Sequence, residues 1–207
     1  IMGILSSAVA ITQYHVEGKL PDPLLETIAA GIKKNLIEEI DSESSDKAIG
    51  WACINDPFSN DFDKSPFLIG TQFVLSMRID KKSIPTKIIQ KYCALEIQKR
   101  LKNSGRDFLS KTEKKEIKDH VLHLLNQRIP ATPNLYDLIW NYEGGTLWFF
   151  SNLKAANEEL ETLFAESFKL SLIRMFPYTA AEMDADLSDS ERDRLNQISP
   201  VNITGKP

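Results

Sequence analysis

Hydrophobic residues along the chain follow two spacings, one typical of strands and the other of helices. Segments rich in β-branched and aromatic residues predict strands at 8–16, 48–54, 67–79, 135–142, 146–150 and 169–176. Apolar residues three and four positions apart predict helices at 22–36, 85–102, 110–125, 153–168 and 188–197. The mixture, with strands following one another in pairs, predicts an α+β fold built on a mostly antiparallel sheet.

Local signals mark the ends of several of these elements. Ser110-Lys111-Thr112-Glu113 is a capping box, in which each side chain satisfies a free backbone N–H of the other residue. Pro130 and Pro133 prevent the helix after it from continuing. Only a short connection separates this helix from the one at 85–102, so the two helices are expected to form an antiparallel hairpin. We expect this hairpin to project as a subdomain over 83–129. Glu143-Gly144-Gly145 predicts a β-hairpin turn.

These elements predict one α+β domain over 2–178, followed by an acidic segment over 179–207. A polar loop is expected at 38–46, and a second surface loop at 55–66. We expect Asp22 to cap the first helix, and Ser151 or Asn152 to cap the helix at 153–168.

Positive charge is concentrated between Arg78 and Arg128. This window holds 14 Lys/Arg and 6 Asp/Glu, a formal +8, within a chain of net charge −4. The remainder, with 11 Lys/Arg against 23 Asp/Glu, carries −12. A segregated basic element in an acidic protein is typical of a surface that holds a polyanion.

The basic residues of the window recur at helical spacing. Lys111, Lys114, Lys115 and Lys118 fall at spacings of three and four and share a helix face. Lysines in a first helical turn oppose the helix dipole at a cost of about 0.3–1 kcal/mol each. Phosphate contact would offset that cost. The alternative is a solvated face whose charges form intrahelical pairs such as Lys115–Asp119. The candidate phosphate-binding residues on the two helices are Lys87, Lys91, Lys99, Arg100, Lys111, Lys114, Lys115 and Lys118.

Sequence motifs for catalysis, metal binding and cofactor binding are absent. His120 and His123 have no third ligand at zinc spacing, and we expect Cys53 and Cys93 to be buried thiols. Phosphate-binding glycine motifs and nucleophile elbows do not occur. We therefore predict a protein that is not an enzyme and has no cofactor or metal. The two-cysteine usage suits the cytoplasm, and no apolar run is long enough to span a membrane.

Aromatic residues cluster in the predicted strands. Trp51, Trp140 and Trp148, with Phe149 and Phe150, could stack on bases as single-strand readers do. Their alternation within strands favours core packing instead.

The helical hairpin and the strand pair after it resemble the RdgC family of recombination-associated, nucleoid-type DNA-binding proteins. The resemblance rests on the run K-T-E-K-K-E-I-K-D-H-V-L-H-L-L at 111–125, followed by Arg128 and a strand pair. Gly50-Trp51 and Lys82-Ser83-Ile84-Pro85 resemble two further patterns of that family. The region of resemblance spans about 49–178.

The resemblance implies homodimers shaped as a ring, with double-stranded DNA passing through a basic hole without sequence preference. It also implies a role in restraining RecA-type recombination and a cytoplasmic, nucleoid-associated location. In that picture Lys82, Lys111, Lys114, Lys115, Lys118 and Arg128 contact phosphates or close the ring. Two alternatives stay open: an assembly module whose hairpin docks an acidic protein surface without DNA, and an unrecognised hydrolase.

Overall fold

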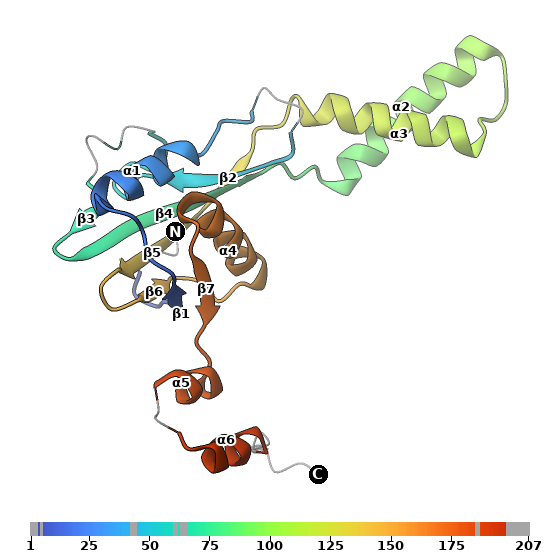
Figure 1. Cartoon of the computed structure of the whole chain (residues 1–207). Coiled ribbons are helices and arrows are strands. Elements are labelled where there is room, and N and C mark those ends of the chain that lie inside the picture. Colours follow the sequence, from blue (N-terminus) through green and yellow to red (C-terminus); the bar gives the residue numbers. More distant parts are fainter. Residues whose placement is uncertain are drawn as a thin grey trace.

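A curved antiparallel sheet forms the body of the molecule (Figure 1). This computed structural model describes residues 4, 6–41, 45–59, 62, 66–184 and 187–197. The strands are β1 (Thr12–Glu17), β2 (Lys47–Ala52), β3 (Leu68–Ile69), β4 (Gln72–Lys81), β5 (Thr132–Asn141), β6 (Thr146–Phe149) and β7 (Ser171–Arg174). They are ordered β2-β4-β5-β6-β1-β7, with β3 paired to β4. Every strand pair is antiparallel, as the sequence predicts.

Helices α1 (Leu24–Lys34) and α4 (Lys154–Phe168) cover one face of this sheet. Both contribute apolar residues to the main core, which also takes in Trp51, Trp140 and Phe149 from the strands. Gly31 is the point of close approach between the two helices, because a Cβ there would lie 2.6 Å from the carbonyl oxygen of Ser167. Helices α1 and α4 together therefore form a single layer over the sheet.

Aromatic packing fixes α4 on the sheet. Trp140, fully buried, has Phe164 edge-on with ring centroids 4.9 Å apart and Phe168 at 5.3 Å. Nearer the start of α4, on the same face, the Tyr14 hydroxyl donates to Asn157 Oδ1 at 2.6 Å and to Glu161 Oε1 at 3.1 Å. Edge-to-face aromatic pairs add about 0.5–1.5 kcal/mol each beyond area burial.

Helices α2 (Thr86–Ser104) and α3 (Lys111–Asn126) leave the sheet between β4 and β5 and project as a two-helix arm (Figure 1). We call the segment from Ile84 to Ile129 the helical hairpin. It has a small core of its own, in which α3 supplies the buried Ile117, Val121 and Leu125. The helical hairpin therefore packs around a small core that is separate from the main core.

Two strand predictions need correction. The strand expected over 67–79 is a tight β3–β4 hairpin, because Gly70 adopts a positive φ of 63° and reverses the chain. The strand expected from residue 8 begins only at Thr12. The prediction of one long strand over 67–79 therefore missed a turn that a single glycine makes possible.

Helix starts also differ from expectation. Pro23, not Asp22, is the N-cap of α1, and Leu153 is the N-cap of α4; neither helix start has a side-chain cap. After β7 the chain forms α5 (Pro177–Asp184), which the sequence did not predict, and then α6 (Asp189–Asn196), which it did. Parts of the predicted loops at 38–46 and 55–66 and of the acidic segment lie outside the described residues.

Candidate nucleic-acid interface

The root of the helical hairpin is held by Lys82, just after β4. Its side chain is 5% exposed, and its ammonium donates to the carbonyl oxygens of Asn126 at 2.8 Å and Asp41 at 3.2 Å. Asp41 also accepts a 2.7 Å hydrogen bond from the Ala131 N–H. The prediction that Lys82 contacts DNA phosphate is therefore wrong: burial and backbone acceptors engage its charge at the joint between sheet and hairpin.

The far end of the hairpin is closed by the predicted capping box. The Glu113 N–H donates to Ser110 Oγ at 3.2 Å, and the Ser110 N–H donates to Glu113 Oε2 at 2.8 Å. Arg106 adds a 2.5 Å bond to the same carboxylate. The backbone N–H of Ser110, then Arg106 and the Ser110 hydroxyl, lower the pKa of Glu113 to about 2. The start of α3 is thus firmly defined, which fixes the direction of the lysines that follow.

Lysine side chains on both helices of the hairpin are exposed to solvent. Lys111, Lys115 and Lys118 lie at i, i+4 and i+7 on one face of α3, and Lys87 and Lys91 share a face of α2. The expected Lys115–Asp119 pair is not formed among the described residues. The solvated-face alternative stays open, because exposed lysines without partners are also what that alternative predicts.

Seven of the ten candidate cations form no ion pair with any described residue. Two others are paired: Lys99 lies 4.0 Å from Glu96, and Arg100 lies 3.9 Å from Glu116 across the two helices. The tenth is the buried Lys82. The seven cations without a carboxylate partner in the described chain are Lys87, Lys91, Lys111, Lys114, Lys115, Lys118 and Arg128.

The Arg100–Glu116 pair marks one side of the seam between α2 and α3. At about 100° per residue, Lys111 and Lys118 lie roughly 140–160° around α3 from Glu116, and Lys87 lies about 140° around α2 from Arg100. These lysines therefore lie on the opposite side of the hairpin from that ion pair. We call the exposed side that carries Lys87, Lys91, Lys111, Lys115 and Lys118 the lysine face.

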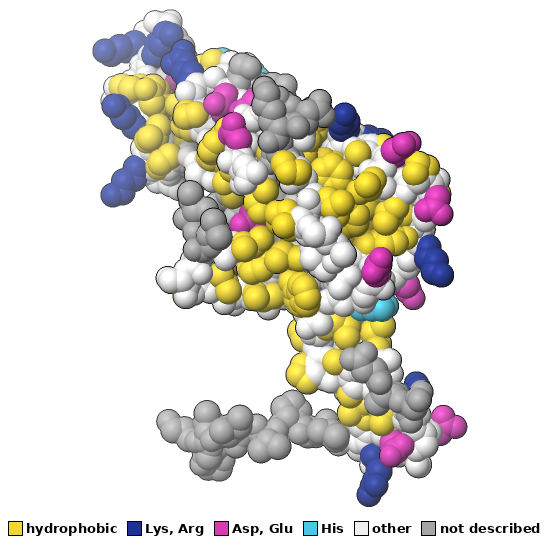
Figure 2. Space-filling view, turned by 90° about the vertical axis from the view of Figure 1, so that its left-hand side faces the viewer, with side chains coloured by type: hydrophobic (Ala, Val, Ile, Leu, Met, Phe, Trp, Pro, Cys, Tyr) yellow, Lys and Arg dark blue, Asp and Glu magenta, His cyan; other side chains and the backbone are white. Residues whose placement is uncertain are grey.

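Figure 2 shows Lys and Arg side chains gathered over the hairpin, at the upper left of that view. The body of the molecule shows fewer of them on this side, with larger hydrophobic areas. Arg78, which begins the basic window, does not contribute to this surface. It is 4% exposed and pairs with Asp80 at 2.5 Å and Glu39 at 2.9 Å. Within the basic window, most of the exposed positive charge therefore lies on the hairpin.

Apolar side chains are exposed on the hairpin as well. Ile88, Tyr92 and Leu95 follow one another at i, i+4 and i+7 on α2, with Leu95 52% exposed. Phe108, in the connection between the helices, is 78% exposed. The side of α2 with Ile89, Cys93 and Ile97 packs against α3, whereas Ile88 and Tyr92 lie outside that contact.

Residues weighed for other chemistry are not brought together. His120 and His123 are exposed on α3, and no group of three His, Cys, Asp or Glu side chains among the described residues could hold a metal ion. Cys53 is buried as predicted, whereas Cys93 is only half-buried. Trp51, Trp140 and Phe149 are core residues, in line with the packing interpretation; Trp148 is 36% exposed.

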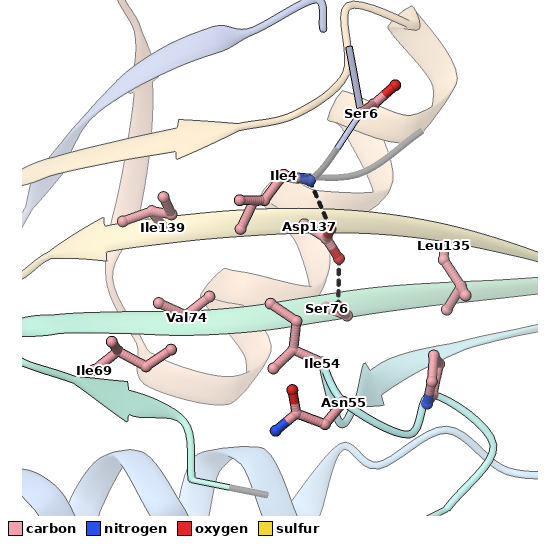
Figure 3. A pocket seen from close by; sticks show the side chains of 11 residues that line it. Ile4, Ser6, Ile54, Asn55, Ile69, Val74, Ser76, Leu135, Asp137 and Ile139 are labelled. Atoms are coloured by element: carbon pink, nitrogen blue, oxygen red, sulfur yellow. Dashed lines mark hydrogen bonds between the residues drawn. The ribbon is translucent and has the colours of Figure 1, made fainter. Parts of the chain in front are cut away.

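An apolar groove of about 660 Å³ lies on the sheet face opposite α1 and α4. Its walls are mainly aliphatic, and Asp137 of β5 lies at its floor (Figure 3). Asp137 accepts hydrogen bonds from Ser76 Oγ at 2.5 Å and from the Ile4 N–H at 3.0 Å. These two hydrogen bonds tie the floor of the groove to β4 and to the N-terminal segment.

Sequence reasoning did not find this groove. Asp137 and Ser76 interrupt the apolar alternation of β5 and β4 at directly paired positions, but that pairing is visible only once the strand register is known. Sequence reasoning also missed Arg106, which pairs with Glu113. Arg106 lies in the connection between the two helices, where no regular spacing of residues indicates its partner.

Comparison with known proteins adds no relative to this picture. No protein-family model matches the chain, and no curated protein matches it significantly. Among the described residues, no helix combines the length and apolar character that crossing a membrane requires.

Proposed function

We propose that this protein binds double-stranded DNA without sequence preference through the lysine face of its helical hairpin. The observation that carries the proposal is the set of seven exposed cations that have no carboxylate partner in the described chain. Each lysine that meets a phosphate releases condensed counterions, and this release drives nonspecific binding. Lysine ammonium groups act as point charges, which suits phosphate contact better than base recognition.

The placement of these cations supports the same proposal. The hairpin extends away from the sheet as a separate arm (Figure 1), and its lysine face lies on that arm. The capping box and the Lys82 joint hold both ends of the arm. An array of ammonium groups on a fixed scaffold loses less conformational freedom on binding than the same groups on a loop. As the RdgC resemblance implies, we propose action as a homodimer that limits RecA-type recombination.

Fluorescence anisotropy with a labelled duplex, in a series of salt concentrations, tests the DNA proposal. If roughly six phosphates are contacted, log K should fall with log[salt] at a slope of about −5, and two unrelated duplex sequences should give the same curve. Replacing Lys111, Lys115 and Lys118 with alanine should make that slope shallower by about 3. Absence of binding at about 50 mM salt would overturn the proposal.

A matched control is available outside the hairpin. Lys19, Lys33 and Lys34 are also exposed, so their alanine variant removes the same formal charge from another part of the surface. The control should leave the slope near that of the unmodified protein. Equal loss in both variants would show that net charge matters and the lysine face does not.

The second candidate function is an assembly module, and the exposed Ile88, Tyr92 and Leu95 favour it. Apolar side chains beside lysines suit a protein surface that is both apolar and acidic. Charge reversal at Lys111 and Lys115 separates the two functions. Light scattering that shows loss of the oligomer supports docking, whereas an intact oligomer that no longer binds DNA supports phosphate contact.

A further inference from the structure

A cationic groove lies at the root of the hairpin, outside the lysine face. It is about 320 Å³ in volume and is formed where the start of β2, the end of β4 and the start of β5 meet the beginning of α4. Lys47, Lys81 and Lys154 line it together with Tyr136, and Glu159 is its one acidic lining residue. The three lysines come from three separate segments of the chain, so sequence spacing gives no hint of them.

Two of these lysines oppose each other within the sheet. Lys47 and Lys81 are direct partners in the antiparallel β2–β4 ladder, so their side chains leave the same face of the sheet. Like charges at directly opposite positions destabilise a strand pair. Glu159 offsets part of this repulsion through its ion pair with Lys47, which leaves the charge of Lys81 to be explained.

Lys154, the third lysine, adds positive charge at the N-terminus of a helix, where the free N–H groups already carry a partial positive charge. Lys154 is the first residue of α4, and the first turn of that helix contains no acidic residue. Leu153 at the N-cap provides no side-chain acceptor for the free N–H groups. A cation at this position is unfavourable with respect to the helix dipole, which favours anions there.

The groove keeps an excess of positive charge. Three lysines against the single carboxylate of Glu159 leave a formal +2 among the lining residues. Glu159 pairs with Lys47, and the exposed Glu158 lies 3.7 Å from Lys154. Lys81 forms no ion pair with a residue in the described part of the chain.

We propose that the groove of Lys47, Lys81 and Lys154 binds a phosphate group. An added anion would offset the positive charge that Glu158 and Glu159 leave unbalanced, above all that of Lys81. The Tyr136 hydroxyl, which has no hydrogen bond to a described side chain or backbone atom, is a further donor at the same place. All of these groups recognise an oxyanion and read no base, so the chemical class is a phosphate diester or a free phosphate.

The location relates the groove to the hairpin. Lys81 ends β4 and Thr86 begins α2, so only a short connection separates the groove from the first helix. A duplex held on the hairpin has phosphates within reach of this root. The inference that the anion belongs to duplex DNA rests on the function proposed above. The inference that the groove binds an anion does not depend on that function.

Two probes separate the site from that function. Duplex binding is measured in a salt series for the Lys81→Gln/Lys154→Gln variant, with Lys33→Gln/Lys34→Gln as the matched control. Glutamine keeps most of the aliphatic stem and removes the charge. In parallel, amide chemical shifts of Lys81, Tyr136 and Ala155 are followed during titration with inorganic pyrophosphate. Thermal unfolding monitored by circular dichroism shows whether both variants fold.

We expect the salt slope to become shallower by about 2 in the groove variant and to stay unchanged in the control. We also expect pyrophosphate to change the amide shifts at the groove in the unmodified protein and not in the groove variant. Duplex binding with an unchanged slope in the groove variant would overturn the groove as a DNA contact and leave the hairpin proposal intact. Saturable pyrophosphate shifts without any duplex binding would support the anion site and overturn the DNA function. Absence of both signals would overturn both proposals.

Discussion

The ammonium of Lys82 donates a 2.8 Å hydrogen bond to the carbonyl oxygen of Asn126, the last residue of α3. This bond joins the end of a strand to the end of a helix 44 residues later, and it places a cation at the negative end of the α3 dipole. Asp41 accepts from Ala131 at the same joint, so three segments of the chain meet there. The direction of the hairpin depends on this contact.

Lys82→Met should therefore destabilise the protein by about 1–3 kcal/mol, because two carbonyl oxygens at the joint lose a charged donor. Urea unfolding measures the change. Lys87→Met, at an exposed position of α2, should stay within about 0.5 kcal/mol of the parent protein. Similar stability in the two variants would contradict the inference that the Lys82 hydrogen bonds stabilise the joint between the sheet and the hairpin.

The capping box predicts an acid-dependent start of α3. The pKa of Glu113 is lowered from its ordinary 4.5 to about 2, first by the Ser110 N–H and then by Arg106. Because the folded-state pKa is the lower one, the stabilising contribution is complete above about pH 4.5 and is lost as the pH falls toward 2. NMR shifts of the Ser110 and Glu113 amides should follow this titration.

The Glu113→Gln variant tests whether the Glu113 carboxylate is the group that titrates. Its amide shifts at the start of α3 should no longer change between pH 4.5 and 2. Glu116→Gln, on the exposed side of the same helix, should leave the titration in place. A titration that persists without the Glu113 carboxylate would assign the acid dependence to another group.

The separate core of the hairpin predicts that it loosens independently of the sheet. Ile117 is fully buried in the hairpin core, and truncation of such a residue costs about 2–5 kcal/mol. All three tryptophans lie in strands, so their fluorescence reports the sheet. In Ile117→Ala, helical circular dichroism should be lost at lower urea than tryptophan fluorescence. Leu95→Ala, at an exposed position, should keep the two transitions closer together.

Gly50 in β2 has a packing requirement that a second glycine lacks. A Cβ at Gly50 would lie 2.4 Å from the backbone nitrogen of Ile37, whereas a Cβ at Gly70 meets no atom within 4 Å. Gly50→Ala should therefore force backbone movement and cost about 1–3 kcal/mol or more. Gly70→Ala should cost only the roughly 1–2 kcal/mol of its positive φ. Urea unfolding of the two variants should rank them in that order.

Local chemistry made much of the fold predictable. The capping box at Ser110, the helix stop at Pro130 and the glycine turn after Glu143 all act within a few residues, so their effects are visible in the sequence. The α+β class and the two-helix hairpin follow from the same short-range patterns. Prediction failed where one residue changed the local geometry, as Gly70 does between β3 and β4.

The candidate site was less predictable, because a charge in the sequence does not show where the ammonium group lies. Helical spacing by itself determined that Lys111, Lys115 and Lys118 share a face, since that relation is set by the 3.6-residue turn. Only the tertiary structure decided that Lys82 is buried against Asn126, and that Lys47, Lys81 and Lys154 meet at one groove. Those relations join distant segments, and strand pairing and helix packing bring such segments together, not periodicity along the chain.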